Sequence, residues 1–365
     1  MNAELRDPDD AWTEQAYRKK YAVIKAANDQ IFSALSPAED EEQRLKLLRD
    51  DIYKAKRQLS DQRREYNAVL TSDARADHLT EHLLKAVHNL NVNYSLMDYS
   101  TFVDSNPEKE AIACFADWHY GMVANNVWNR YDTEECRSRV ATCVGYMKKY
   151  LRQNHISMLR VALLGDMVEG AIHVTSRVRS EENVCDQIIN VSELIADAIN
   201  ELSSVVNEVH VYACTGNHAR TVQNKKDSVY ADNMEKLIPW WLRERLRENH
   251  KVTVHESHFD EFTFINVFDY NVCAVHGDTM SFKEIGGTVN TLSTKLFGAP
   301  IDYTISGHAH HLEEFEQFNI ESILVRSLCG TDDFAAEKHL FGEAGQTLII
   351  FNKEYGRECT YHIPL

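Results

Sequence analysis

Five short apolar runs in the second part of the chain each end in a polar cluster that contains a carboxylate, an amide or an imidazole beside glycine. The clusters are Asp117-Trp118-His119-Tyr120-Gly121, Gly165-Asp166-Met167-Val168-Glu169-Gly170, Gly216-Asn217-His218-Ala219-Arg220, His276-Gly277-Asp278 and Gly307-His308-Ala309-His310. Their oxygen and nitrogen donors suit Mn, Fe or Zn ions. Glycine lets the backbone turn sharply and lets a ligand approach closely. A single cluster is most often an ordinary strand-ending turn, but five in succession predict a metal site at strand ends.

The number and type of these donors predict a centre for two ions. About seven donors are needed by two divalent ions roughly 4 Å apart when one carboxylate bridges them. The eight cysteines are scattered singly, without a C-x-x-C pair, and none falls in the five clusters. This pattern disfavours a structural zinc site and a disulfide framework, and it is typical of a reduced, cytoplasmic protein.

Composition describes an ordinary soluble chain of about two domains. It has 365 residues, of which 44% are hydrophobic and 26% charged. No apolar run approaches the roughly 18 residues that span a bilayer, and the first residues do not resemble a signal peptide, so no membrane partner is expected.

The formal charge of −17 is spread over the whole chain. Residues 1–108 hold 15 Lys and Arg against 20 Asp and Glu, and the remainder holds 24 against 36. Neither part is therefore a basic nucleic-acid arm. Acidity does not exclude a nuclease, because bound divalent cations supply positive charge where a phosphate docks.

The first hundred residues are expected to be helical. Tyr21, Ile24, Ile31 and Leu35 recur at helical spacing, and Ser36-Pro37-Ala38-Glu39 is a capping box with proline at the first helical position. A heptad seam typical of a coiled coil follows over 45–69, and a third helix is expected over 79–90. The polar stretch 91–109 marks the boundary, which predicts a helical region over 1–105 and a second domain over 106–365.

The role of the helical region has three interpretations. It could form a hairpin or three-helix bundle that packs on itself or on the second domain. It could be a dimerisation stalk, which would make the protein a homo-oligomer. It could also contact DNA through its basic side chains, namely Lys54, Lys56, Arg57, Arg63 and Arg64.

From 111 onward, apolar runs alternate with amphipathic helices. Runs at 111–116, 161–164 and 209–214 alternate with helices expected near 134–154, 183–206 and 227–247. Further runs follow at 252–255, 262–267, 272–275, 301–305, 320–325 and 347–351. Alternation first and strands later predicts a layered α/β or α+β domain with a sheet-on-sheet core.

The ordered series D-x-H, G-D, G-N-H, H-G-D and G-H-x-H resembles the calcineurin-like metallophosphoesterase superfamily, from about residue 111 to 310. The resemblance implies a two-sheet β-sandwich flanked by helices, with a dimetal site at the strand ends. It implies one ion held by Asp117, His119 and His310, a bridging Asp166, and a second ion held by Asn217, His276 and His308. It also implies His218 as the catalytic histidine, and hydrolysis by a hydroxide that bridges the two ions.

Departures from the superfamily's branches bear on the substrate. Protein Ser/Thr phosphatases carry Asp-Arg after the second motif and an acid after G-N-H, where this chain has Glu169-Gly170 and Ala219. Purple acid phosphatases place a tyrosine where Glu169 stands. The first cluster is most similar to the D-W-H-x-G opening of SbcD-like DNA repair nucleases, and the layout is similar to exonuclease-like members from phages. No capping domain or ATPase-docking helices are evident after residue 330, so a partner ATPase is not expected.

The resulting hypothesis is a dimetal-dependent phosphodiesterase, an endo- or exonuclease that uses two divalent ions, preferably Mn²⁺, and takes DNA as substrate. Candidate substrate-binding residues on the metal-binding loops are His173, Arg177, Arg179 and Arg220, which could form a basic rim. The alternative is a phosphatase or phosphodiesterase of small nucleotides or phosphoproteins. Asp332 and Asp333 are expected to shape a loop near the site.

Overall fold

The computed structural model describes residues 11–34, 49–57, 60, 106–172, 178–229, 231–257, 259–296, 298–339 and 341–365. These fall into two units, which divide at Asp73 and Ala74. In the first unit, α1 (Ala11–Ala34) is the expected first helix, and 49–57 are helical. Tyr21 and Ile24 on α1 are exposed. The capping box, the third helix, most of the heptad seam and the expected domain boundary lie outside the described residues.

The second unit contains a six-stranded sheet in the order β13-β12-β1-β4-β5-β6. Strands β1 (Lys109–Phe115), β4 (Met158–Leu163), β5 (Glu208–Ala213) and β6 (Val252–Val254) are parallel. The antiparallel strands β12 (Gly345–Asn352) and β13 (Gly356–Pro364) complete the sheet. Because β1, β4 and β5 run in register and in one direction, the polar clusters that follow them emerge at the same edge.

A five-stranded sheet in the order β10-β11-β9-β8-β7 faces the first. Its strands are β7 (Phe262–Val267), β8 (Tyr270–Val275), β9 (Tyr303–Ser306), β10 (Glu313–Gln317) and β11 (Ile320–Leu324). β8 and β9 are parallel neighbours, so the clusters after them also share an edge. A small hairpin joins β2 (Ala124–Asn125) to β3 (Arg130–Tyr131).

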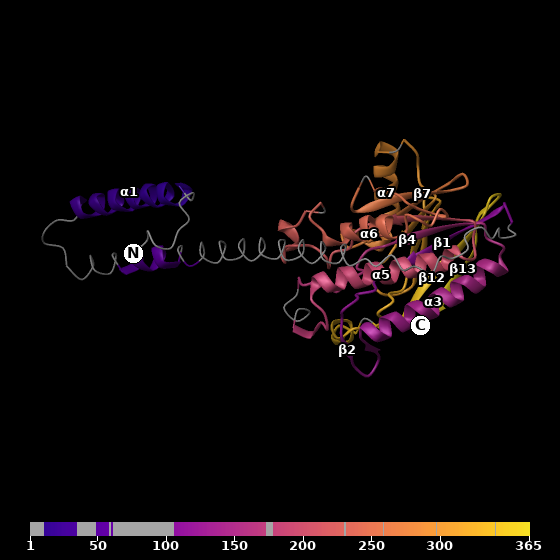
Figure 1. Cartoon of the computed structure of the whole chain (residues 1–365). Helices are drawn as coiled ribbons and strands as arrows, with labels where there is room; N and C mark the ends of the chain where they lie inside the picture. The colour runs from indigo at the N-terminus through magenta and orange to yellow at the C-terminus, as the bar shows by residue number, and fades with distance from the viewer. Residues whose placement is uncertain are drawn as a thin grey trace. The chain divides into compact units, whose positions relative to one another are not determined.

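Alternate strand residues divide between two faces of the first sheet, as a period of two requires. On β1, Ile112 and Cys114 belong to a core between the sheets, whereas Ala113 and Phe115 belong to a core shared with helices. The helices on that outer face are α3 (Thr133–Gln153), α5 (Val184–Ser203) and α6 (Leu237–Arg245). Figure 1 shows α3 and α5 side by side along the sheet.

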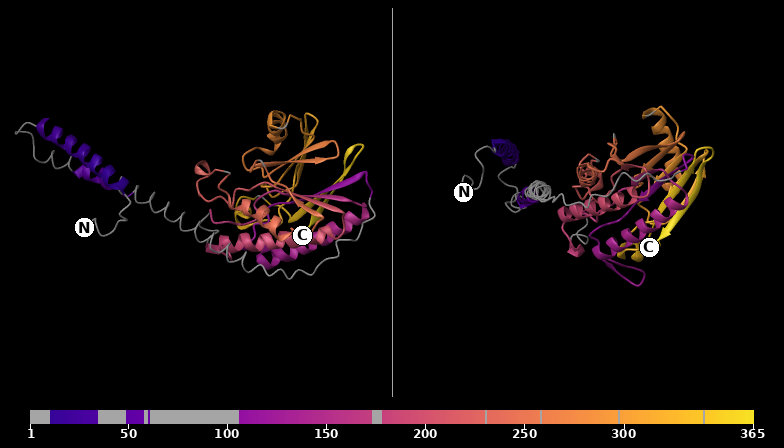
Figure 2. Two further views of the ribbon diagram at one scale, coloured as in Figure 1. Left: turned by 45° about the horizontal axis from the view of Figure 1, so that its top comes forward. Right: turned by 45° about the vertical axis from the view of Figure 1, so that its right-hand side comes forward.

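Helix α7 (Phe282–Leu296) covers the outer face of the second sheet, where Ile285 and Val289 pack against Phe262, Cys273 and Val275. Figure 2 shows α7 on the opposite side of the paired sheets from α3 and α5. The second unit therefore has four layers, helix–sheet–sheet–helix. The expected fold class, a two-sheet sandwich flanked by helices with helices in the N-terminal region, is confirmed.

Short elements complete the unit: η1 (Lys225–Asp227), η2 (Met234–Lys236) and α8 (Asp333–Glu337). The helix expected over 227–247 is broken into η1, η2 and the nine-residue α6. All eight cysteines are unpaired. Among the described helices, none combines the length and apolarity needed to cross a bilayer.

Candidate metal centre

The polar clusters converge because the backbone takes unusual turns immediately after the strands. Asp117, His119, Asp166, His308 and His310 all have positive φ angles, between 44° and 71°. Such left-handed conformations are uncommon for residues with a side chain, and their concentration at one place indicates a functional site.

Two glycines allow the turns after β4 and β5 to touch through their backbones. A Cβ atom on Gly165 would lie 2.4 Å from the Gly216 nitrogen, and one on Gly216 would lie 2.2 Å from the Asp166 nitrogen. A side chain at either position would therefore separate Asp166 from Asn217. Glycine is required here for close approach of two chains.

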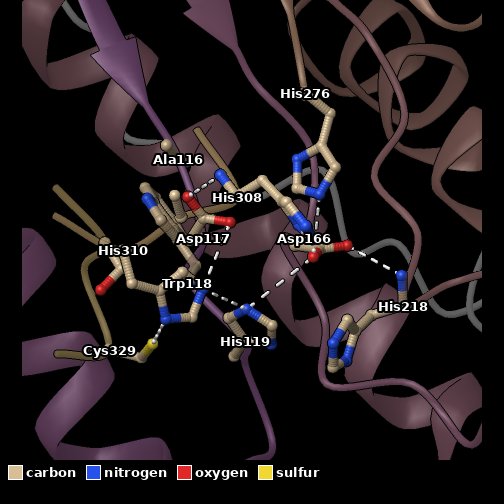
Figure 3. A network of polar contacts seen from close by, with 12 residues as sticks. Ala116, Asp117, Trp118, His119, Asp166, His218, His276, His308, His310 and Cys329 are labelled. Carbon is tan, nitrogen blue, oxygen red and sulfur yellow. Dashed lines mark hydrogen bonds and ion pairs between the residues drawn. The ribbon is translucent and has the colours of Figure 1, made fainter. Parts of the chain in front are cut away.

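One half of the site is formed by Asp117, His119 and His310 (Figure 3). The Nε2 atoms of His119 and His310 lie 3.2 Å apart, and His310 Nε2 lies 3.6 Å from Asp117 Oδ1. Asp117 and His119 are buried, whereas His310 is partly exposed. The three side chains thus direct one oxygen and two nitrogen atoms toward one another, as the ligands of a single cation do.

The other half is formed by Asn217, His276 and His308. His276 Nε2 lies 3.1 Å from Asn217 Oδ1, and the rings of His276 and His308 have centroids 4.9 Å apart. His276 Nδ1 donates to the Leu164 carbonyl at 2.9 Å, which leaves Nε2 as the ligand atom of the neutral ring.

Asp166 lies between the two halves. Its Oδ2 is 3.1 Å from His276 Nε2 and 3.9 Å from His119 Nε2. Its Oδ1 accepts a hydrogen bond of 2.8 Å from the His218 backbone nitrogen, which fixes the orientation of the carboxylate. All seven residues expected from the sequence therefore lie close together, with Asp166 between the two halves.

The chemistry of this donor set fits bound cations. Asp117 Oδ1 is fully buried and is the one buried side-chain oxygen or nitrogen without a hydrogen-bond partner among the described residues. Burying an acceptor without a partner costs about 1–3 kcal/mol, and more when the group is charged. Asp117 Oδ2, in contrast, accepts from the His308 backbone nitrogen at 2.9 Å. A divalent ion facing Oδ1 would remove this deficit.

The electrostatics of the site also favour positive charge. Burial disfavours a charged imidazole, yet the Asp166 carboxylate raises the pKa of His276 to about 10. Burial opposes protonation of His119 as well, yet the neighbouring Cys329 and Glu169 raise its pKa to about 10. Excess negative charge in a buried place is the condition under which a cation binds.

The structure adds Glu169, to which the sequence assigned no role. Its Oε2 accepts from His119 Nδ1 at 3.1 Å and lies 3.6 Å from His218 Nδ1. A carboxylate on Nδ1 leaves His119 Nε2 free to act as a ligand. The available signal was a carboxylate three residues after Asp166 on the same turn.

A cysteine also lies at the edge of the site, although none was expected there. Cys329 Sγ is 3.9 Å from His310 Nδ1, on the side of the ring opposite to the ligand atom (Figure 3). Cys329 follows β11 on the connecting segment that also carries Asp332 and Asp333, but no metal-ligand pattern marks the cysteine itself.

The four candidate substrate-binding residues differ in where the structure places them. His173 and Arg177 lie outside the described residues. Arg179 is exposed and pairs with Asp333 at 2.7 Å. The Arg220 guanidinium donates to three backbone carbonyls of its own loop, including that of Asn217 at 2.8 Å, and so braces a ligand loop. The basic rim stays a prediction.

The sequence matches no protein-family model and no curated protein. An archaeal phosphodiesterase aligns with 70% of this chain and 99% of its own, at 12% identity and a TM-score of 0.34. Vps29 from Entamoeba histolytica, complexed with zinc, aligns with 70% and 98%, at 11% identity and a TM-score of 0.32. A predicted phosphoesterase from Streptococcus pneumoniae gives 9% identity and a TM-score of 0.29. Similarity at this level does not indicate an activity, so inference about function rests on the site itself.

Proposed function

We propose that this chain is a dimetal-dependent phosphodiesterase of the metallophosphoesterase type, with DNA as its substrate. The observation that carries the proposal is the position of Asp166 after β4, where its carboxylate lies between two sets of ligand atoms that come from four other strand ends. Two adjacent ions that share one carboxylate are the usual arrangement for displacement at phosphorus.

The residues that would hold the ions follow from the two halves of the site. Asp117, His119 and His310 would hold one ion, Asn217, His276 and His308 the other, and Asp166 both. When bound, such ions lower the pKa of coordinated water and neutralise charge on phosphate oxygens. The nitrogen and oxygen donors suit Mn²⁺, which is the proposed metal.

His218 is proposed to exchange a proton with the substrate. Its Nδ1 donates to the Glu169 carbonyl at 3.0 Å, so Nε2 is the atom left to face a phosphate ester. Its ring lies edge-on against that of His119, with centroids 4.5 Å apart. A histidine in this position can assist the departure of the leaving oxygen.

DNA is proposed as substrate on the strength of the D-W-H-x-G opening. The structure adds that Trp118 in this opening is buried and that its Nε1 donates to Gln346 Oε1 at 3.1 Å. The Gln346 amide in turn donates to the Ala116 carbonyl at 3.0 Å. Trp118 therefore anchors the turn that carries Asp117 and His119, and it is not available as a substrate contact.

The test is a comparison of substrates. The purified protein is incubated with Mn²⁺ and linear, circular or single-stranded DNA, and in parallel with bis-p-nitrophenyl phosphate and p-nitrophenyl phosphate. Hydrolysis of the diester and of DNA is expected, and cleavage of closed circles would indicate endonuclease action. Activity confined to the monoester would replace the proposal with a phosphatase. The Asp166→Asn variant serves as control for a contaminating nuclease.

A further inference from the structure

The β2–β3 hairpin presents a large aromatic side chain to solvent. Trp128 at its tip is 66% exposed, and the preceding Val127 is 94% exposed. Phe341, from the loop after α8, is 47% exposed and lies beside Trp128, with ring centroids 4.7 Å apart and an interplanar angle of 48°. Aromatic rings of this size are usually covered when they serve only to pack a fold.

The hairpin is held firmly to the segment 329–333. Asn129 Nδ2 donates to the carbonyls of Cys329 at 2.7 Å and Thr331 at 3.1 Å. Asn126 Nδ2 donates to Asp333 Oδ1 at 3.1 Å. The tip also has internal order, because Asn126 Oδ1 accepts from the backbone nitrogens of Trp128 and Asn129 at 2.9 Å each. The exposed Trp128 is therefore a positioned ring on a braced turn.

The same segment forms one wall of the metal centre. Cys329 Sγ lies 3.9 Å from His310 Nδ1. Gly342, next to Phe341, packs so closely that a Cβ atom there would lie 2.0 Å from the His310 carbonyl oxygen. Thr331 Oγ1 donates to the Gly342 carbonyl at 3.0 Å and so joins the two loop segments that form this wall. The aromatic pair and the ligand His310 are thus connected through backbone contacts.

A cation is connected through Asp333 to the hairpin that carries Trp128. Arg179 pairs with Asp333 at 2.7 Å, and Asp333 is the residue whose other oxygen accepts from Asn126 of the hairpin. The Arg179 side chain is 61% exposed, so it keeps donors for a further anion. An exposed aromatic pair and an exposed arginine, joined through Asp333 near the proposed phosphodiester site, have the composition of a site for a base and its phosphate.

We propose that Trp128 and Phe341 form a stacking platform for an unpaired nucleobase of the DNA strand whose phosphodiester enters the metal centre. This proposal rests on the proposed function for the reaction but makes a separate statement about binding. A stacked base requires an accessible ring face, which duplex interior bases do not offer. The expected substrate is therefore a single strand or a frayed end.

The experiment measures binding and hydrolysis separately. A 5′-labelled oligodeoxythymidine is titrated by fluorescence anisotropy with the full chain and with Trp128→Ala, beside an oligonucleotide of equal length with abasic sites. Trp128→Ala is expected to raise the Kd for the thymidine oligonucleotide about tenfold or more, because stacking on an aromatic ring is a large part of single-strand affinity. The abasic strand should bind both proteins equally.

Two variants separate stacking from folding. Trp128→Phe keeps a ring and should recover most of the affinity. Trp240→Ala removes another partly exposed tryptophan, on α6, and should leave the Kd unchanged. The nitrophenyl rings of bis-p-nitrophenyl phosphate can themselves stack on an aromatic side chain, so kcat at saturating substrate is compared, and it should be the same in Trp128→Ala and the unaltered protein.

The outcomes are distinguishable. Equal Kd values for Trp128→Ala and the unaltered protein, or an equal loss for the abasic strand, would overturn the platform. A lower kcat for this diester in Trp128→Ala would show a structural role and overturn the platform as well. Tighter binding of a uridine oligoribonucleotide would overturn DNA as the source of the base. Failure of the unaltered protein to hydrolyse the diester would count against the proposed function alone, since the anisotropy still reports on the platform.

Discussion

Glu235 and Gly216 are joined by a hydrogen bond of 2.7 Å, in which the Gly216 backbone nitrogen donates to Glu235 Oε2. The other carboxylate oxygen, Oε1, accepts from the Met167 backbone nitrogen at 2.5 Å. Gly216 precedes Asn217 and Met167 follows Asp166, so one side chain, only 3% exposed, connects the turns that carry two ligands. Asn233 reinforces the link by donating to the Gly216 carbonyl at 2.7 Å.

Replacement of Glu235 by glutamine should weaken metal binding without touching a ligand. The amide can accept only one of the two hydrogen bonds, and its NH₂ group would face a backbone N–H. Loss of partners that orient ligands typically lowers metal affinity by about 10- to 100-fold. Calorimetric titration with Mn²⁺ checks the expectation.

The matched control for Glu235→Gln is Glu193→Gln. Glu193 also accepts two kinds of hydrogen bond, from Trp241 Nε1 at 2.6 Å and from Arg245 Nε at 2.9 Å, but it does so on α5. Its substitution should leave Mn²⁺ affinity unaltered. Equal affinities for Glu235→Gln and the unaltered protein would remove Glu235 from any role in positioning the ligands.

Glu169→Gln should affect the metal centre and His218 together. Its carboxylate accepts from His119 Nδ1, and it also lies 3.6 Å from His218 Nδ1. An amide in its place removes the negative charge that lies beside both imidazole rings. We expect Mn²⁺ affinity about tenfold lower, together with a lower kcat for bis-p-nitrophenyl phosphate at saturating metal. A change in affinity with an unaltered kcat would limit Glu169 to His119.

His218→Ala should separate chemistry from metal binding. The side chain belongs to neither proposed set of ligands, so the content of two ions per chain is expected to persist, as measured by elemental analysis. The kcat should fall by about 10²- to 10⁴-fold, the usual contribution of a positioned acid or base. Unchanged turnover would sink the proposed role of His218, and a loss of metal would show that His218 supports the ligands instead.

The convergence of the polar clusters was predictable from where they stand in the sequence. Asp117, Asp166 and Asn217 each follow an apolar run within three residues, and parallel strands deliver such residues to one edge. Strand β10 was not predictable in the same way. Its sequence, EEFEQ, is polar and its side chains are largely exposed, so it has no apolar pattern to find.

Helix α7 was not predicted from the sequence, and neither were the positions of Glu235 and Cys329, for different reasons. α7 contains the pair Gly286-Gly287, which lowers helix propensity, and packing of its apolar face against the second sheet overrides this. Glu235 and Cys329 lie on segments that carry no metal-ligand pattern. They reach the site through contacts with residues that are distant in the sequence. Such positions become visible only once the chain is folded.

Arg139 is a buried guanidinium that holds the loop beside the candidate metal centre. Its Nη1 donates to the carbonyls of Leu328 at 2.9 Å and Cys329 at 3.0 Å, and its Nη2 donates to Asn129 Oδ1 at 2.8 Å. Arg139→Ala should lower the free energy of unfolding by about 2–4 kcal/mol, because buried acceptors lose a charged donor. Urea denaturation followed by circular dichroism measures the change.

Arg152→Ala is the control for Arg139→Ala, since Arg152 is exposed near the end of the same helix. It should alter the free energy of unfolding by no more than about 0.5 kcal/mol. Arg139→Lys keeps the charge but cannot reach the Leu328 carbonyl and Asn129 together, so it should recover only part of the loss. Because Asn129 also ties the β2–β3 hairpin to Cys329, the Arg139→Ala protein should bind oligodeoxythymidine more weakly even at temperatures where it remains folded. Equal stability of the two alanine variants would show that the buried guanidinium does not hold this wall of the site.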